Sequence, residues 1–373
     1  MLVRSTVGTF PNAGAGPPPP WRPGIPTRAT RWVGWLQARP ILCLVLLTPG
    51  IPEYLSTSSS LVSLAVNPFF FFLQMAINVG QYTAGALLIR EAVIRWHKGW
   101  ATVFVLGLAY GITEEGLGDN TLFNSNHGTD GILGSFGRFA GVNWVWATGV
   151  LAFHVIYSIG LPILLLRLAV PSTRGRSLLT RRGIVLVLAS LATSTSIETV
   201  IVFRSTQFWM GETLLIGSAL TITALVLIGN RIPADLWTPR SFRPTARPWE
   251  VGAIGFGFFP IAFLLEYGFT SDRVPPALLI LVELAIFATL WETVRRRIGR
   301  VENEFLLVNL AFGFVLWQAA FGVLLTLGLP YTLPLVALAV WFFVRLRRGY
   351  VPGPTAPPSG PIPPGEVTGT RGS

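Results

Sequence analysis

Ten apolar segments run through the chain, and each is long enough to cross a lipid bilayer or nearly so. They occupy 40–57, 68–93, 100–117, 143–170, 183–203, 212–230, 249–270, 275–294, 304–328 and 331–346. A hydrocarbon core about 30 Å thick needs about 20 apolar helical residues. Only 12% of the 373 residues are charged, which is about half the share of a soluble domain. The sequence therefore predicts an all-α fold, a polytopic bundle of about ten transmembrane helices.

Basic residues mark every second loop between these segments. They cluster in 22–39, 95–98, 174–182, 231–247, 295–300 and 345–348, whereas the alternate loops contain only Arg138, Arg204 and Arg273. Because cytoplasmic loops carry the excess of Lys and Arg, this alternation predicts that both termini are cytoplasmic. Lys98 is the only lysine among the 28 basic residues. That bias is typical of a high-GC genome, so we expect a multi-pass protein in the plasma (inner) membrane of a high-GC bacterium.

The two ends of the chain differ in composition from the apolar region between them. Residues 1–30 and 349–373 are rich in proline and glycine, which predicts disordered tails around a transmembrane helical domain at 31–348. The net charge is +11, yet the basic residues lie between apolar segments rather than on a soluble face. We therefore expect the lipid bilayer, and not nucleic acid, as the partner, while the oligomeric state stays open.

Common cofactor motifs are missing from the chain. It contains no P-loop, HExxH, GxSxG or CxxC motif, and its single cysteine, Cys43, excludes an intrachain disulfide and a cysteine-based metal site. Gly252, Gly255 and Gly257 lie inside an apolar segment, which indicates helix packing rather than a nucleotide loop. Nucleotide and haem are not expected, and the cofactor and any metal stay unknown.

The densest polar stretch, "YGITEEGLGDNTLFNSNHGTDG", begins inside the third apolar segment. An ionisable residue at the centre of a membrane helix costs about 2.5–3.5 kcal/mol on insertion scales, so it is rarely without a role. Glu115 follows Gly107 and Gly111 at helical spacing, and Gly118 continues the stripe. Because stripes of small residues pack against other helices, we expect Glu114 and Glu115 to face protein or a cavity rather than lipid.

Two further segments contribute candidates near the predicted outer side. His154 and Ser158 lie one turn apart in the fourth segment, and Glu198 follows Ser194 and Thr195 in the fifth. Glu53 and Glu266 fall at a similar depth by helical rise. We therefore expect these groups to collect around one polar site, although a lone membrane histidine often only bonds a neighbouring helix.

The predicted catalytic residues are Glu114, Glu115 and His154. The predicted substrate- or ion-binding residues are Asp119, Asn120, Asn124, His127, Glu198 and Ser158. The amides of the outer loop could equally serve ordinary loop structure. Glu91 and Arg95, which are spaced i,i+4 in the second segment, are interpreted as a solvated pair at the cytoplasmic interface.

The adjacent glutamates and the later membrane histidine resemble motifs of the CPBP (Abi, CAAX-protease-like) family of intramembrane proteases. That family carries EExxxR, then FxxxH, then a histidine with a small or amide residue four positions later. Glu114 and Glu115 match the pair, and His154 with Ser158 resembles the last motif, but Gly118–Asn120 stands where the arginine is expected. The FxxxH spacing occurs in Phe123–His127, within the loop. The resemblance implies that a glutamate activates water while a histidine stabilises an oxyanion.

The sequence leaves three functions open. The first is a CPBP-like intramembrane hydrolase, and the second is a proton- or cation-coupled transporter. The third is a non-enzymatic membrane protein that binds a partner through its outer acidic loop. The segments "TAGALLIREA" and "GLAYGITEEGL" also resemble uncharacterised bacterial polytopic membrane proteins. A small molecule, an ion and a membrane peptide are all open as the substrate.

Overall fold

The computed structural model describes residues 38–56, 58–59, 61–126, 134–236, 246–270, 273–297, 304–325 and 332–348. The helices and strands named below all belong to one compact unit, Pro40–Ser373. The predicted disordered tails at 1–30 and 349–373 and the candidate His127 lie outside the described residues.

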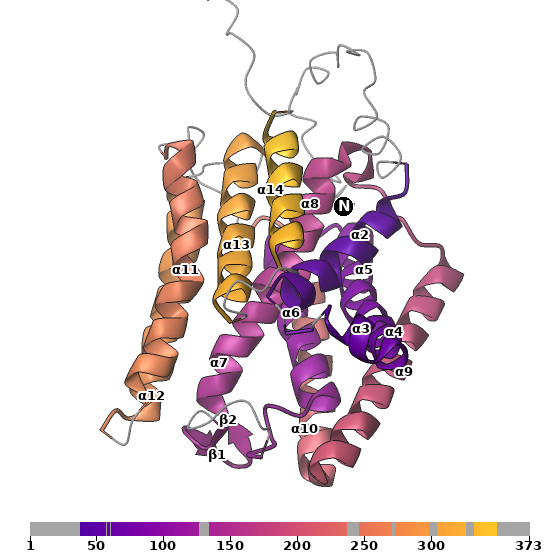
Figure 1. Cartoon of the computed structure of the whole chain (residues 1–373), viewed down its shortest axis with the longest axis vertical. Helices are drawn as coiled ribbons and strands as arrows, with labels where there is room; N and C mark the ends of the chain where they lie inside the picture. The colour runs from indigo at the N-terminus through magenta and orange to yellow at the C-terminus, as the bar shows by residue number, and fades with distance from the viewer. Residues whose placement is uncertain are drawn as a thin grey trace, which may run out of the picture. The chain divides into compact units, whose positions relative to one another are not determined.

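Helices occupy all ten of the predicted apolar segments (Figure 1). In chain order these are α2 (Pro40–Pro49) with η1 (Gly50–Leu55); α4 (Pro68–Asn78), η2 (Val79–Thr83) and α5 (Ala84–Arg95); α6 (Trp100–Gly111) with η3 (Ile112–Gly118); α7 (Trp144–Phe153), η5 (His154–Gly160) and α8 (Leu161–Ala169); α9 (Arg181–Thr206); α10 (Gly211–Arg231); α11 (Pro248–Phe269); α12 (Pro276–Arg297); α13 (Glu304–Leu325); and α14 (Thr332–Arg348). Short elements connect them: α3 (Ser63–Val66), η6 (Pro171–Thr173) and the antiparallel pair β1 (Arg138–Phe139) and β2 (Val142–Asn143).

The all-α prediction is confirmed, and six of the described helices are long and apolar enough to cross a membrane. They begin at Trp144, Arg181, Gly211, Pro248, Pro276 and Leu306, and Pro40–Leu55 forms a shorter apolar helix. Large apolar side chains such as Leu186, Leu220 and Leu281 are exposed on α9, α10 and α12. Such surfaces suit lipid, which solvates them as well as a protein core does. The count of ten crossings and the cytoplasmic termini stay predictions.

Three helices begin with a side-chain cap, and each cap is a residue type that is common at this position. Asn67, Asn143 and Thr180 each accept a hydrogen bond from a backbone N–H in the first turn of α4, α7 and α9, respectively. These bonds satisfy donors that have no partner inside the helix. The cap at Asn143 fixes the start of the continuous helical run 144–169. His154 lies just before the midpoint of this run.

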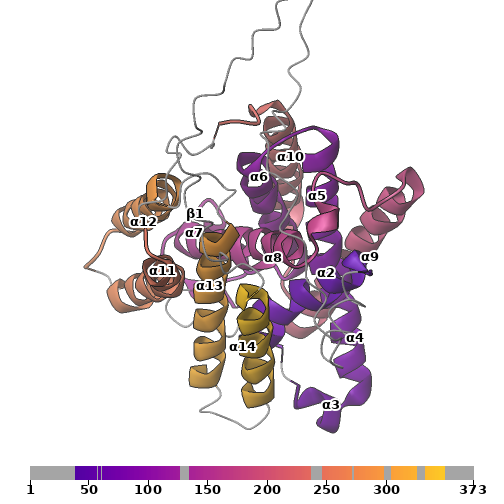
Figure 2. The same cartoon turned by 90° about the horizontal axis from the view of Figure 1, so that it is seen from above.

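Glycines set the closest contacts between helices. α13 lies between α11 and α14 (Figure 2), and a Cβ placed on Gly313 would lie 2.1 Å from the carbonyl oxygen of Gly252. A Cβ on Gly255 would lie 2.4 Å from the carbonyl oxygen of Leu310. The prediction of helix packing is thus confirmed for Gly252 and Gly255, but a Cβ on Gly257 would meet no atom within 4 Å.

The glycine stripe of α6 packs against the helical run that carries His154. A Cβ on Gly107 would lie 3.2 Å from Val155, and one on Gly111 would lie 2.8 Å from Leu151 and 3.3 Å from the Cβ of His154. This close approach brings the end of α6 against η5. It confirms that the glutamates after this stripe face protein.

Candidate functional site

Four π-helical turns converge on one polar cluster. They are η1, η2, η3 and η5, and each interrupts or extends an otherwise α-helical run. π-helical turns are rare and occur often at functional sites. Each of the four carries part of the cluster: Glu53 on η1, Tyr82 on η2, the glutamate pair on η3, and His154 on η5. The extra residue in each turn shifts the side chains that follow it around the helix axis.

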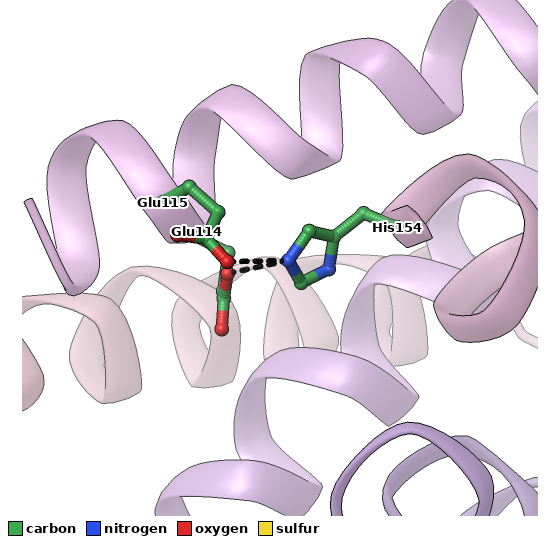
Figure 3. Close-up of side chains that lie close together, drawn as sticks. All are labelled: Glu114, Glu115 and His154. Carbon is green, nitrogen blue, oxygen red and sulfur yellow. Dashed lines mark hydrogen bonds and ion pairs between the residues drawn. The ribbon is translucent and has the colours of Figure 1, made fainter. Parts of the chain in front are cut away.

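Glu114, Glu115 and His154 form a buried triad (Figure 3). The Nε2 atom of His154 lies 2.8 Å from Oε1 of Glu115 and 3.0 Å from Oε2 of Glu114. Its Nδ1 atom lies 3.0 Å from the hydroxyl oxygen of Ser158. The three residues are only 6%, 7% and 1% exposed, respectively. Two carboxylates this close repel when both are ionised, so a proton or a cation between them stabilises the arrangement.

Hydroxyl groups extend the triad on both sides. The hydroxyl of Thr121 donates a hydrogen bond to Glu115. The hydroxyl of Tyr82 lies 3.0 Å from Oε1 of Glu114 and 2.5 Å from Oε1 of Glu53. A phenol has one proton, so Tyr82 can donate a hydrogen bond to only one of these two carboxyl groups. The other contact is a hydrogen bond when the second carboxyl group is protonated and donates to the phenol oxygen. This arrangement favours the retention of a proton in the cluster.

We expect Tyr82→Phe to lower the free energy of unfolding by about 1–3 kcal/mol, because it leaves the carboxyl groups of Glu53 and Glu114 without the hydroxyl that bridges them. Tyr157→Phe is the matched control, since the buried hydroxyl of Tyr157 has no hydrogen-bond partner among the described residues. Unfolding in mixed detergent micelles measures both variants. Equal stabilities for the two variants would contradict the bridging role of Tyr82.

Glu198 lies beside the triad rather than in it. Its Oε2 atom accepts a hydrogen bond of 2.5 Å from Nε2 of Gln81, and a Cβ on Gly118 would lie 2.3 Å from the same oxygen. The hydroxyl of the next residue, Thr199, donates to the carbonyl of Leu117 at 2.6 Å. α9 therefore packs directly on η3, and Glu198 supports the turn that holds the glutamate pair.

The outer-loop candidates serve mainly the loop itself. Asn120 has a left-handed backbone (φ 62°) and donates from its side chain to the carbonyl of Gly118. The side-chain oxygen of Asn124 accepts from the backbone N–H of Asn126. Asp119 caps η3, and its backbone N–H donates to the carbonyl of Glu114. Ordinary loop structure, the alternative reading of these residues, therefore accounts for the side-chain hydrogen bonds of Asn120 and Asn124.

Glu266 does not join the triad, although its estimated depth suggested that it would. Its carboxylate lies against Gly149, where a Cβ would be 2.8 Å from Oε2. Gly149 precedes His154 by five residues, or about 7.5 Å along the helix. Depth alone could not tell which side of α7 this residue of α11 approaches. Glu53, by contrast, does reach the cluster through Tyr82.

Tyr82, Gln81 and Thr121 were not among the residues predicted for the site. The signal for the first two was the polar run Asn78–Thr83 inside an apolar segment, where Asn78, Gln81, Tyr82 and Thr83 are all buried. Polar side chains inside a membrane helix face protein partners. Their helical spacing alone did not identify the partners, because a π-helical turn begins at Val79.

The triad could also hold a divalent cation. One ligand atom from each of Glu114, Glu115 and His154 lies within 4.8 Å of the others. Neighbouring ligands of an octahedral ion with bonds of about 2.1 Å lie about 3.0 Å apart. The Nε2–carboxylate distances of 2.8 and 3.0 Å match that spacing as well as they match hydrogen bonds. One imidazole and two carboxylates form a donor set that suits a first-row divalent metal.

An apolar cavity of about 540 Å³ lies on the neighbouring side of the helical run 144–169. Residues of α6, α7, α8, α12 and α13 line it, and they include Leu151 and Val155 in the helical turn around His154. Leu151 also contacts the glycine stripe of α6 at Gly111. The cavity therefore adjoins the helical turn that carries His154, although His154 itself does not line it.

Comparison with known proteins places the chain in a family. The chain matches the model of an uncharacterised membrane protein family over residues 42–350. The chain belongs to this uncharacterised membrane protein family. No curated protein and no solved structure matches it. The match identifies the chain as an integral, multi-pass membrane protein, and it does not confirm the resemblance to the CPBP family.

Proposed function

We propose that the chain is an intramembrane hydrolase that uses Glu114, Glu115 and His154. The observation that carries the proposal is the position of the His154 Nε2 atom within 3.0 Å of both carboxylates. A general base and the group that orients it must lie within hydrogen-bond reach, and this triad meets that requirement inside a water-poor site. Hydrolysis of an acyl bond needs a base that activates water and a group that stabilises the negative charge on the carbonyl oxygen. The carboxylates suit the first function, and the imidazole suits the second.

The contacts of the two glutamates favour different roles. Both oxygens of Glu115 are engaged, one by His154 and the other by Thr121. Oε2 of Glu114 accepts no hydrogen bond within the described part of the chain and only faces His154. We therefore assign Glu114 as the general base and Glu115 as the residue that positions the imidazole.

The reaction follows from these roles. Glu114 takes a proton from water as the water oxygen attacks the scissile carbonyl carbon, and protonated His154 donates a hydrogen bond to the oxygen that becomes negative. The bond between carbon and the leaving amine then breaks, and the amine takes the proton from Glu114. If a divalent cation occupies the triad, it supplies Lewis-acid polarisation, and the same residues hold it.

The substrate class follows from the surroundings of the triad. The adjoining 540 Å³ cavity is lined almost entirely by apolar side chains, and these include Leu151 and Val155 from the helical turn around His154. Apolar cavities with a few convergent polar groups nearby are typical binding sites. We infer a membrane-anchored peptide or lipidated peptide as the substrate, a class that the resemblance to CPBP proteases also implies.

We expect Glu114→Gln to reduce the cleavage of a fluorogenic membrane-anchored peptide by about 10²–10⁴-fold in proteoliposomes, because an amide cannot accept the proton of water. Glu292→Gln is the matched control, since Glu292 pairs with Arg295 at 2.7 Å at the end of α12. Exposed ion pairs contribute about 0–1 kcal/mol, so this control should cleave at the wild-type rate. Wild-type cleavage by Glu114→Gln would overturn the assignment of the base.

A second candidate function, a proton-coupled carrier, is favoured by the shared hydroxyl of Tyr82. It joins Glu53 on η1 to Glu114 on η3, and Ser59 donates to the far oxygen of Glu53 at 2.8 Å. Chains of carboxyl and hydroxyl groups inside membranes suit proton transfer. A pH-gradient-driven flux into proteoliposomes that Glu53→Gln abolishes, together with an absence of peptide cleavage, would favour the carrier over the hydrolase.

A further inference from the structure

The hydroxyl of Tyr110 is buried beside the triad and has no hydrogen-bond partner within the described part of the chain. Tyr110 is only 4% exposed and lies on α6, four residues before Glu114. A hydroxyl that leaves water without gaining a new partner costs folding free energy. Such buried groups are rare in native proteins, and a catalytic role is one explanation for them.

The aromatic ring of Tyr110 lies against the triad. Its centroid is 5.8 Å from that of the His154 imidazole, with the two planes at 63°, and 5.9 Å from that of the Tyr82 ring. The hydroxyl lies within electrostatic range of four glutamates, Glu114 above all. The free O–H group of Tyr110 therefore belongs to the same polar cluster as the proposed hydrolytic residues.

A glycine on the neighbouring helix α5 makes room for this ring. A Cβ on Gly85 would lie 2.4 Å from Cδ2 and 2.5 Å from Cε2 of Tyr110. Any larger residue at this position would therefore push the ring away from its place. The close contact fixes the position of the Tyr110 hydroxyl before a substrate binds, and donors fixed in advance are the ones that best stabilise a developing charge.

Other hydroxyl groups that contact the triad are already engaged by it. They belong to Tyr82, Thr121 and Ser158. The Nε2 atom of His154, the donor proposed for the oxyanion, is shared between two carboxylates. Because oxyanion holes combine several donors, hydrolysis at this site needs a donor besides His154. Tyr110 has such a donor free.

We propose that the hydroxyl of Tyr110 is a catalytic group that donates a second hydrogen bond to the oxyanion, next to that of His154. This inference rests on the proposed hydrolytic function and adds a residue to it. As the water oxygen attacks the carbonyl carbon, an electron pair of the C=O bond moves onto the carbonyl oxygen, and the O–H of Tyr110 stabilises that charge. Tyr110 keeps its proton throughout, so the protons of the reaction still pass between water, Glu114 and the leaving amine.

Cleavage of the fluorogenic membrane-anchored peptide by full-length Tyr110→Phe in proteoliposomes tests this role. We expect kcat to fall about 10²–10³-fold, the cost of removing one oxyanion donor, and KM to change by less than about twofold. The thermal midpoint of unfolding should not fall, because the lost hydroxyl leaves no partner unpaired. A purely structural hydroxyl would give the opposite pattern, a lower midpoint with an unchanged kcat.

Tyr157→Phe is the matched control. It also removes a buried hydroxyl that has no hydrogen-bond partner among the described residues. The ring of Tyr157 packs on Phe259 at a centroid distance of 4.7 Å, within an apolar cluster. Its kcat should therefore equal that of the wild type.

Gly85→Ala tests the same hydroxyl through the position of its ring. It should lower kcat in the wild-type background but not in the Tyr110→Phe background, where the donor is already absent. A wild-type kcat for Tyr110→Phe, or an equal loss from Gly85→Ala in both backgrounds, would overturn this proposal and leave the proposed function in place. An absence of cleavage by the wild-type protein would overturn both.

Discussion

His154→Ala should lower the free energy of unfolding by about 3–5 kcal/mol, the cost of removing one partner from a buried charged cluster. His154 contributes the only imidazole near the glutamate pair in the described part of the chain, and it contacts both carboxylates. Without it, Glu114 and Glu115 face each other with no cation between them. Unfolding in mixed detergent micelles, monitored by circular dichroism, measures the loss.

A compensating substitution separates this electrostatic cause from a simple loss of packing. His154→Ala/Glu115→Gln removes one of the two facing charges, so we expect it to be more stable than His154→Ala by about 1–3 kcal/mol. A cavity left by the imidazole would be present in both variants and would not respond to Glu115. If the double variant is no more stable than His154→Ala, the carboxylates do not depend on His154 in the way that the structure indicates.

Gly313→Leu should destabilise the contact between α11 and α13 by more than about 3 kcal/mol, the upper end of ordinary overpacking. A Cβ at this position would lie 2.1 Å from the carbonyl oxygen of Gly252 and 2.8 Å from the backbone nitrogen of Phe256. Both atoms belong to the helix backbone, so they cannot turn away as a flexible side chain could. The same unfolding assay measures the effect.

Gly257→Leu provides the control on the same pair of helices. A Cβ on Gly257 would meet nothing within 4 Å, so leucine should be tolerated there. Because leucine favours the helix over glycine by up to about 1 kcal/mol, this variant should be as stable as the wild type or more so. Similar losses for Gly313→Leu and Gly257→Leu would show that the glycine contact does not set the spacing of α11 and α13.

The helices could be predicted from the sequence because lipid imposes a long apolar run on each crossing. All ten apolar segments are helical, and the first helical run ends at Leu55, within two residues of the predicted boundary. The glycine stripe Gly107–Gly111 also predicted the buried face of α6 correctly, since only close packing against η5 explains small residues at that spacing.

The full polar cluster could not be predicted, because four π-helical turns change the helical register where the site residues lie. An extra residue in a turn leaves no signature in composition, so spacing that starts from α-helical geometry misplaces Gln81 and Tyr82 relative to Glu53 and Glu114. Burial of Glu91 was missed for a different reason. Its partners Ser177 and Leu178 lie 86 and 87 residues away in the chain.

Incorporation of ¹⁸O tests most directly whether the triad adds water to an acyl bond. The wild-type protein in proteoliposomes would be incubated in H₂¹⁸O with a library of membrane-anchored and lipidated peptides, followed by mass spectrometry of the new carboxyl termini. We predict products that carry one ¹⁸O atom with the wild type and with Glu292→Gln, and none with Glu114→Gln or His154→Ala. Unlabelled products, or equal labelled yields from the wild type and Glu114→Gln, would contradict it.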